Sequence, residues 1–272
     1  MTDFDKIRSY YSMFNENARL SADPSGQLEF MMTMKKLHRF LQPSSTILDL
    51  GGASGAYTFP LAEEGHTLYL ADLSPALIQQ AKDKLSAAPS PNIHSCDVVN
   101  ALDLSRYPDG MFDAVLLFGP LYHLLAEEER QQCVQEVHRV LRPGGQVFAA
   151  FIPRLSGAIA IVDRACFAPQ QVNRENLRHV FRTGQFINNA STGFQEGYYP
   201  TSDEIVSLFG ANGFEKTHLS SVRGFAYEKE EAVFSLQNEA VRSEVLALAE
   251  ETCEDPAIIE TCGHALYIGR KF

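Results

Sequence analysis

No run of apolar residues in the sequence approaches the roughly 18–20 that a membrane-spanning helix needs. The longest apolar stretches run from Val147 to Ile152 and from Ala158 to Val162, and we expect both to be buried strand or helix segments. Residues 1–5 show neither the basic start nor the apolar core of a secretory signal. We therefore expect a cytoplasmic protein with no membrane partner.

Cysteine pairs and closely spaced histidines are also missing. The five cysteines are odd in number and none forms a C-x-x-C pair, which suits reduced thiols and argues against a disulfide scaffold or a cysteine-rich zinc site. The eight histidines include no H-x-x-x-H or H-E-x-x-H spacing, the patterns in which helical histidines bind zinc. We predict that the protein binds no metal.

Basic residues are scarce relative to acidic ones: 23 stand against 34, which gives a formal net charge of −11. Such a charge repels a phosphate backbone, so nucleic acid is not an expected partner. Arg174, Arg178 and Arg182 are a local exception, because their spacing would form a basic stripe on a helix. The stripe could attract an acidic substrate, but a solvated helix face is the favoured interpretation.

The residues that are present are typical of a globular α/β protein. Apolar residues make up 45% of the chain, which is enough for a core. From about residue 44 to residue 151, short apolar stretches alternate with amphipathic ones. This alternation predicts βαβ units and a doubly wound, mostly parallel sheet.

Around this core we expect three further parts. The full division is a helical arm at 1–43, the core at 44–153, a cap or substrate insertion at 154–200, and a completion of the core at 201–272. The last part would contain a helical insertion at about 224–262, with one long helix from Glu228 to Glu251.

A glycine-rich loop follows the first predicted strand, at Asp49 to Gly55, and precedes a helix. Ligands of doubly wound folds bind beyond the carboxyl ends of the strands. Residues without a Cβ let the backbone turn sharply and approach a ligand closely. A tight turn with no ligand uses glycine for the same reason, so the loop alone does not decide the matter.

Acidic residues end the next two predicted strands. Asp72 stands 21 residues after Gly51, where a carboxylate can accept hydrogen bonds from both hydroxyls of a ribose. Asp97 ends the third strand, where a carboxylate can accept from an exocyclic adenine amine. Each aspartate could instead cap the segment that follows it, although Ser74 competes for that role after Asp72.

These segments together resemble class I S-adenosylmethionine (SAM)-dependent methyltransferases, in the group that includes the ubiquinone/menaquinone-biosynthesis C-methyltransferases. The resemblance rests on segments in the family's order: Ile47 to Gly55, Leu70 to Ser74, Cys96 to Val98, Phe112 to Val115, Phe118 to Leu124 and Val140 to Gly145. It implies a Rossmann-like core that binds SAM and releases S-adenosylhomocysteine (SAH).

The resemblance also implies which residues bind the cofactor. They are Asp49, Gly51, Gly52, Ala53, Gly55, Asp72, Leu73, Cys96, Asp97, Val98, Phe118 and Gly119, with Tyr11 and Arg19 from the arm. Arg19 could pair with the methionine carboxylate, or Arg19 and Tyr11 could have only surface and packing roles. Ala53 departs from the family, which usually has glycine there. A dinucleotide is disfavoured, because its G-x-G-x-x-G loop would need glycine at positions 53 and 56.

Tyr122 and His123 are the candidate catalytic residues, because they follow the fourth strand at the rim of the expected site. Both could instead pack beneath the cap, and Tyr198 and Tyr199 could line the acceptor pocket or form a turn. The leading hypothesis is in-line methyl transfer to a small-molecule acceptor by a monomer or homodimer. A SAM-binding protein without turnover, or a methyltransferase of a macromolecule, remain the alternatives.

Overall fold

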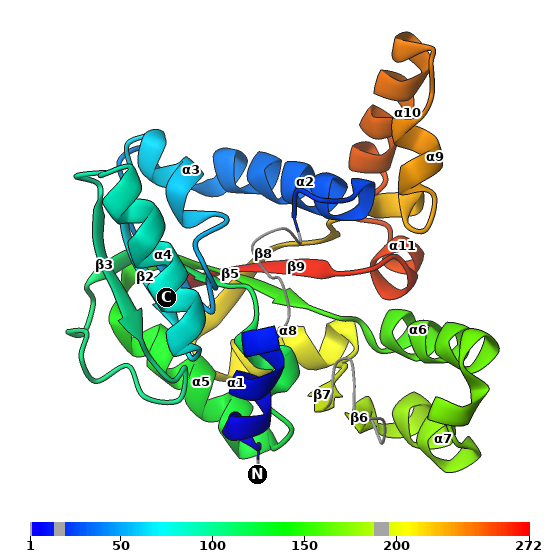
Figure 1. The fold of residues 1–272 in the computed structure, drawn as a ribbon. Helices are drawn as coiled ribbons and strands as arrows, with labels where there is room; N and C mark the ends of the chain where they lie inside the picture. The colour runs from blue at the N-terminus through cyan, green and yellow to red at the C-terminus, as the bar shows by residue number, and fades with distance from the viewer. Residues whose placement is uncertain (1, 14–19, 188–195) are drawn as a thin grey trace.

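The computed structural model describes residues 2–13, 20–187 and 196–272. Its centre is a seven-stranded sheet with the strand order β3-β2-β1-β4-β5-β9-β8 (Figure 1). The strands are β1 (Thr46–Leu50), β2 (Thr67–Asp72), β3 (Ile93–Val98), β4 (Phe112–Leu117), β5 (Leu141–Phe151), β8 (Phe214–Ser221) and β9 (Ala265–Lys271). The predicted doubly wound, mostly parallel sheet is confirmed.

The first five strands are parallel, and the last two pair antiparallel at one side of the sheet. The central strands are apolar on both faces, as Leu48 and Ile47 show: both are fully buried, but they belong to separate core clusters on the two sides. Strands covered on both faces give the continuous apolar stretches seen in the sequence.

Helices cover each face. On one face lie α2 (Pro24–Phe40), α3 (Thr58–Glu63) and α4 (Pro75–Ala87), which share a core cluster with Ile47 and Phe148. On the other face lie α5 (Glu127–Val140), α8 (Ser202–Ala211) and α11 (Pro256–Thr261), packed on Leu48 and Tyr267. In Figure 1, α2 and α3 lie above the sheet, and α5 and α8 lie below it.

β9 matters for the site because its direction is reversed. Ala265, its first residue, pairs with Phe151, the last residue of β5. The start of β9 therefore lies at the same edge as the ends of the parallel strands. His264, just before β9, lies beside Tyr122, which follows β4.

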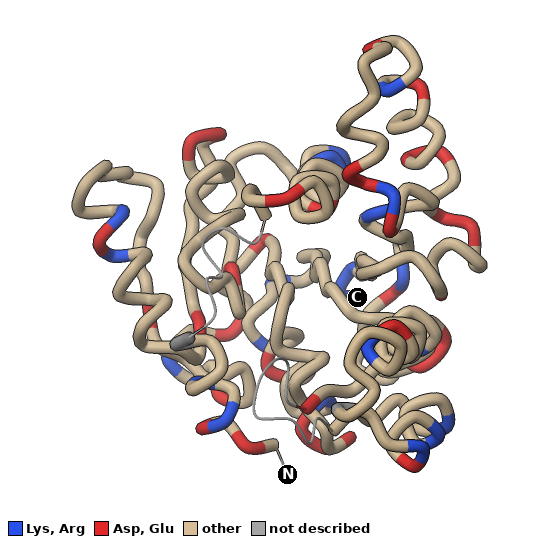
Figure 2. The backbone as a smooth tube through the Cα atoms, turned by 45° about the vertical axis from the view of Figure 1, so that its right-hand side comes forward, with Lys and Arg blue, Asp and Glu red and all other residues tan. Residues whose placement is uncertain are grey.

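The arm and the cap flank this edge. The arm contributes α1 (Phe4–Met13) and α2, and the cap contains α6 (Arg154–Phe167), η3 (Pro169–Gln171), α7 (Arg174–Thr183) and the small pair β6 (Gln185–Ile187) and β7 (Glu196–Tyr198). Arg174, Arg178 and Arg182 are all exposed on α7, as the solvated-face interpretation expects, and α7 stands out in blue at the lower right of Figure 2.

The insertion between β8 and β9 differs from the prediction. The single helix expected from Glu228 to Glu251 is wrong: η4 (Gly224–Ala226) is followed by α9 (Glu230–Phe234) and then by α10 (Glu239–Glu251). The break has a local cause, because the Asn238 side chain accepts a hydrogen bond from the Val241 backbone N–H at 3.2 Å. Asparagine is a strong N-cap and starts a new helix there.

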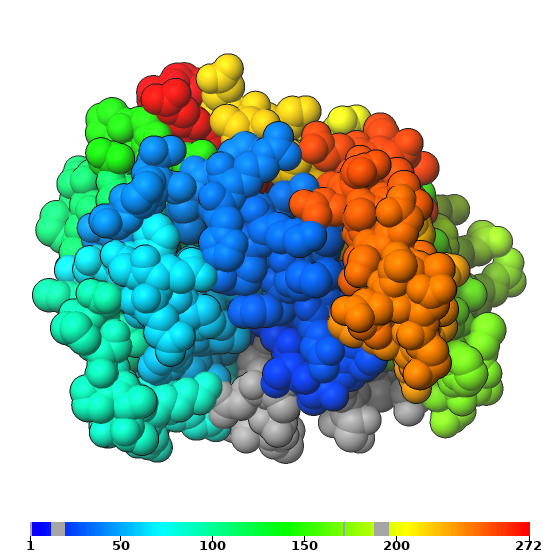
Figure 3. Space-filling model, turned by 90° about the horizontal axis from the view of Figure 1, so that it is seen from above, coloured from blue at the N-terminus to red at the C-terminus, as the bar shows by residue number. Residues whose placement is uncertain are grey.

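These helices lie beside α2 rather than over the sheet edge. Figure 3 shows them in orange along one side of α2, in blue. Lys35 of α2 and Glu250 of α10 form an ion pair at 2.5 Å. In the described part of the chain, no helix combines the length and the apolar character needed to cross a bilayer.

Candidate functional site

The loop between β1 and α3 has a left-handed backbone at three positions. Gly51, Ala53 and Gly55 have φ angles of +78°, +51° and +90°. A Cβ added at Gly51 would lie 2.6 Å from Cδ of Pro120, so glycine lets this loop touch η2 (Pro120–His123). At Ala53 a left-handed backbone costs about 1 kcal/mol for a residue with a Cβ, so other contacts must hold the loop in place.

Asp72, at the end of β2, supplies such a contact. Its Oδ2 accepts a hydrogen bond from the Ala53 backbone N–H at 2.9 Å, and its Oδ1 accepts one from the Ser74 N–H at 2.8 Å. Ser74 also caps α4, because its hydroxyl accepts from the Leu77 N–H at 3.4 Å. Asp72 therefore joins two loops at the sheet edge, and it also faces the cavity beside them.

Asp49 lies fully buried behind the same loop. Its Oδ2 accepts a hydrogen bond from the Thr58 hydroxyl at 2.6 Å, while Oδ1 has no hydrogen-bond partner within the described residues. Burial raises the pKa of Asp49 to about 6, and the nearby charge of Asp72 adds to the effect. A cation that binds close to the loop would stabilise the charged form of this buried carboxylate.

A cavity opens at this edge between the loop, the end of β4 and helix α1. It encloses about 710 Å³, part of it open to solvent. Of the sequence-predicted residues, those that line it are Gly51, Ala53, Asp72, Leu73, Phe118, Gly119, Tyr11, Tyr122 and His123. The structure thus brings together residues separated by more than 100 positions in the chain.

Other predicted residues lie elsewhere. Asp49, Gly52 and Gly55 are not among the lining residues, and Arg19 lies outside the described residues. Cys96 packs in the core, Val98 is 47% exposed, and Asp97 pairs with Arg106 at 2.9 Å. At the end of β3 the lining residues are instead Val99, Asn100 and Ala101, one to three positions further along.

Sequence reasoning named Tyr11 of the arm but missed the other α1 residues at the cavity. Phe4, Ile7 and Arg8 line the cavity beside Tyr11. The helical spacing of Phe4, Ile7 and Tyr11 was a usable signal, because it places these side chains on one face of a helix. What the spacing did not indicate was that this face covers the sheet edge.

His123 is held in a buried position. Its Nε2 lies 2.9 Å from the hydroxyl oxygen of Tyr11, and burial lowers the pKa of the ring to about 3. An imidazole with so low a pKa is a weak base. Tyr122 donates its hydroxyl to the Phe118 carbonyl at 3.3 Å. These contacts favour a wall-forming role for both residues.

A second cavity, of about 340 Å³ and partly open to solvent, adjoins the first and shares Phe118 and Tyr122 with it. The remaining lining residues are Glu29, Thr33, Tyr57, Ala150, Val222, His264 and Leu266. Glu29 and His264 form a close pair, with Oε2 and Nδ1 2.8 Å apart. Sequence reasoning did not single out this pair, since its members are 235 residues apart.

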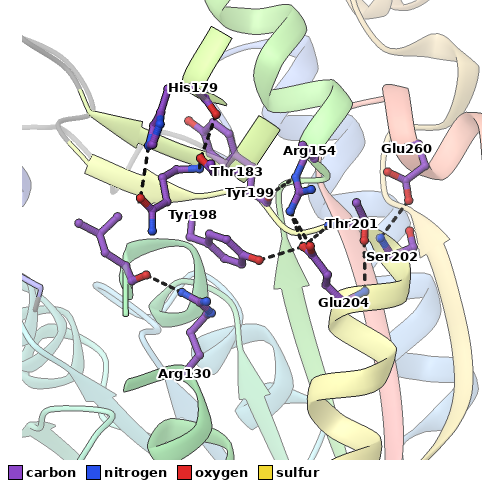
Figure 4. Close-up of polar contacts among 12 residues, drawn as sticks. Arg130, Arg154, His179, Thr183, Tyr198, Tyr199, Thr201, Ser202, Glu204 and Glu260 are labelled. Atoms are coloured by element: carbon purple, nitrogen blue, oxygen red, sulfur yellow. Dashed lines mark hydrogen bonds and ion pairs between the residues drawn. The ribbon is translucent and has the colours of Figure 1, made fainter. Parts of the chain in front are cut away.

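The cap is anchored by a polar cluster around Glu204 (Figure 4). Glu204, on α8, accepts two hydrogen bonds from Arg154 Nη2 and one from the Tyr198 hydroxyl at 2.9 Å. Arg130 lies over the Tyr198 ring at 3.7 Å from its centroid. Tyr199 is buried, and burial raises its pKa. Neither tyrosine lines the two cavities described above, so both serve as packing for the cap.

Comparisons with known proteins agree with this architecture. Residues 48–149 match a family model described as a methyltransferase domain. The ubiquinone/menaquinone biosynthesis C-methyltransferase of Hydrogenovibrio crunogenus is 30% identical over 110 residues, which cover 39% of this chain and 42% of that protein. The demethylmenaquinone methyltransferase of Listeria monocytogenes is 28% identical over 151 residues, covering 53% and 58%. The chain thus spans about half the length of the curated relatives it matches.

Two solved structures show the same fold over most of their length. The PH0226 protein from Pyrococcus horikoshii has a TM-score of 0.66 at 16% identity, covering 97% of this chain and 99% of that one. The Burkholderia thailandensis 1,6-didemethyltoxoflavin-N1-methyltransferase, solved with its namesake ligand and SAH, has a TM-score of 0.59 at 15% identity, covering 98% and 85%.

The sheet order, the left-handed loop after β1 and the carboxylate at the end of β2 define a class I methyltransferase core. Residues 48–149 match the methyltransferase domain family, and this match, the curated relatives and the fold together support a class I SAM-dependent methyltransferase, as the sequence resemblance predicted.

Proposed function

We propose that this protein transfers the methyl group of SAM to a small-molecule acceptor. The observation that carries the proposal is the cavity at the carboxyl edge of the sheet, where the β1 loop, Asp72 and Phe118 meet. A ligand at this edge is the general rule for open α/β sheets. A sensor that binds SAM without turnover would use the same cavity, and the second cavity beside it favours an enzyme, since its lining includes a histidine–carboxylate pair that cofactor binding alone does not need.

The residues of the first cavity fit SAM in charge and in shape. Asp49 and Asp72 supply negative charge around the loop, which suits a ligand with a sulfonium and an ammonium group. Leu73, Val99 and Phe118 offer apolar walls that suit an adenine ring. Asp49 lies behind the loop, and its buried Oδ1, which has no hydrogen-bond partner among the described residues, would be stabilised by a cationic ligand nearby.

SAM, when bound, supplies an electrophilic methyl carbon, and no metal is needed for its transfer. The protein then contributes position and exclusion of water. The loop and Asp72 would fix the cofactor, α1 would cover it through Ile7 and Tyr11, and Phe118 with Tyr122 would separate it from the acceptor. We assign Asp97 and Val98 only to the outer surroundings of the adenine.

A small-molecule acceptor is supported by two observations. Two curated relatives are named for quinone biosynthesis, although they are only 28–30% identical over part of the chain. The second cavity is lined mainly by aromatic and aliphatic side chains, which suits a small apolar compound. The net charge of −11 disfavours a nucleic acid acceptor.

Isothermal titration with SAH tests the proposal. We expect wild-type protein to bind SAH and Asp72→Ala to bind it about 10- to 100-fold more weakly, because charged hydrogen bonds are lost. Asp113→Asn is the matched control: this carboxylate also accepts a backbone N–H, from Thr46 at 2.7 Å, but does not line the cavity. Failure of the wild-type protein to bind SAH would refute the proposal.

A further inference from the structure

The second cavity contains a histidine–carboxylate pair that the cofactor does not require. We propose that His264 accepts the proton released during methylation, that Glu29 positions it, and that the acceptor is a small planar molecule with an ionisable hydroxyl group. This inference rests on the proposed function and deepens it. Its starting observation is the 2.8 Å contact between His264 Nδ1 and Glu29 Oε2.

The fold brings this pair to the cofactor side of the sheet. His264 directly precedes β9, whose first residue pairs with the last residue of β5. Glu29 comes from α2, which packs on the face of the sheet that contains the Leu266 side chain of β9. The Tyr122 and His264 rings lie parallel, at an interplanar angle of 6° and a centroid separation of 6.1 Å. Tyr122 also lines the cofactor cavity, so His264 lies one side chain away from that cavity.

The contact with Glu29 fixes the role of each ring nitrogen. Nδ1 faces the carboxylate and therefore carries the proton that it donates to Oε2. Nε2 is then left as a lone-pair acceptor, and among the described residues no hydrogen bond occupies it. The side chain of His264 is 26% exposed and that of Glu29 is 10% exposed, so the nitrogen is reachable while its partner is shielded.

The Glu29–His264 pair is better suited to proton transfer than His123 and Tyr122, which line the first cavity. His123 has its Nε2 against the Tyr11 hydroxyl and a pKa lowered to about 3 by burial. The Tyr122 hydroxyl is directed to the Phe118 carbonyl. His264, by contrast, has a carboxylate beside it that stabilises the imidazolium once a proton arrives.

The walls of the second cavity define the acceptor. Tyr57, Phe118 and Tyr122 provide aromatic surface, and Val222 and Leu266 provide aliphatic surface. The polar groups of the lining are Thr33, the Glu29–His264 pair and the hydroxyls of the two tyrosines, of which that of Tyr122 is directed to the Phe118 carbonyl. A mostly apolar cavity with polar groups at one place selects a flat, apolar molecule that presents one polar group there. A phenol or an enol has this form.

The step balances as a nucleophilic substitution. The hydroxyl oxygen of the acceptor forms a bond to the methyl carbon, and the bond from that carbon to sulfur breaks, with its electron pair staying on sulfur. The hydroxyl proton moves to Nε2 of His264, and the imidazolium is held by Glu29. The products are a methyl ether, SAH and a proton, which leaves to solvent when the ring is regenerated.

The probe 2-naphthol tests the pair without relying on turnover. The excited state of 2-naphthol is a strong acid, which gives its proton to a base that lies beside it. The anion formed in this way emits at a longer wavelength than the neutral molecule. The chain contains no tryptophan, so the background emission is low. In the SAH complex we expect bound 2-naphthol to emit as the anion, and we expect His264→Gln to abolish this emission. Glu29→Gln should reduce it, and Glu29→Asp should restore part of it.

The matched control is His38→Gln, which removes another histidine–glutamate contact, to Glu64 at 3.0 Å, on the exposed side of α2. It should leave the anion emission unchanged. Titration with SAH shows that each variant is folded and keeps the cofactor site. With SAM in place of SAH, His264→Gln should lower kcat for 2-naphthol about 100- to 10,000-fold and leave KM for SAM unchanged.

The outcomes separate the two proposals. Intact SAH binding without anion emission in the wild type, or with equal emission in His264→Gln, overturns the assignment of the base. Intact SAH binding without any methylation of 2-naphthol overturns the hydroxyl-bearing acceptor class. Loss of SAH binding in the wild-type protein would instead overturn the proposed function itself.

Discussion

The backbone N–H of Ala53, a residue in the left-handed conformation at φ +51°, donates to Oδ2 of Asp72 at 2.9 Å. The bond joins the end of β2 to the loop after β1. Asp72 therefore has two roles: its carboxylate faces the cavity in which a ligand would bind, and it holds the loop that this ligand would contact. Loop conformation and ligand affinity are therefore coupled.

Ala53→Gly should raise the free energy of unfolding by up to about 1 kcal/mol. Glycine removes the cost of a left-handed backbone but adds freedom to the unfolded chain, and the two effects partly cancel. Urea unfolding measures the difference. Ala56→Gly is the control, since Ala56 is in the same loop without a positive φ, and it should lower stability. An equal loss in both variants would show that Ala53 carries no strain.

Gly51→Ala should be more harmful than an ordinary change at a left-handed glycine. Its Cβ would meet Cδ of Pro120 at 2.6 Å, so the loop and η2 must separate. We expect a loss of about 2–3 kcal/mol in unfolding free energy, from strain and overpacking together. Gly65→Ala isolates the strain, because Gly65 has φ +91° with nothing within 4 Å of the added atom. Similar losses at both sites would contradict the close loop contact.

The raised pKa of Asp49 makes stability depend on pH. The folded protein keeps this proton up to about pH 6, whereas the ordinary carboxyl value is 3.8. The folded state therefore binds more protons between these values, and the contribution of Asp49 to stability falls as pH rises from about 4 to about 6. The difference in urea stability between wild type and Asp49→Asn, measured at pH 4 and at pH 7, should therefore shift against the wild type as pH rises, whatever other groups contribute to both proteins.

The same carboxyl predicts how pH affects cofactor binding. A cation near the loop favours the charged form of Asp49, so affinity for SAM should increase as pH rises through about 6 and then level off. Titrations at pH 5 and pH 7.5 measure the difference between wild type and Asp49→Asn. If the variant kept the full pH dependence, another group would be responsible.

His123 predicts the opposite trend in acid. Burial lowers its folded-state pKa to about 3, below the ordinary value of 6.5. The unfolded chain binds the proton first, so the contribution of His123 to stability is lost as pH falls from about 6.5 toward 3. His123→Phe should remove this part of the acid sensitivity, as measured by thermal unfolding across that range. An unchanged acid profile would mean that the ring is not held neutral.

The sequence was sufficient for the parallel core because its strands are buried on both faces. Continuous apolar stretches such as Phe112–Leu117 leave little choice of element, and the glycines after β1 mark the loop. The long helix was wrong because one capping residue, Asn238, interrupts an otherwise helical pattern. A single capping residue is a weak signal in a sequence, but in the structure it determines where one helix ends and the next begins.

The sequence predicted only part of the site, for a different reason. Asp72 and Gly51 are marked by their places at strand ends, but Glu29 and His264 meet only because β9 runs antiparallel beside β5. No spacing rule joins residues 235 positions apart. At the end of β3 the lining residues lie just past Val98, because the cavity follows the loop rather than the strand.

A crystal structure of the protein grown with SAH would show whether the cavity at the carboxyl edge of the sheet holds the cofactor. The account predicts the nucleoside in the cavity between α1 and the β1 loop, with its ribose hydroxyls on Asp72, and the thioether directed toward Phe118 and Tyr122. SAH bound elsewhere, or a cavity closed by its own side chains while SAH is present at saturating concentration, would contradict it.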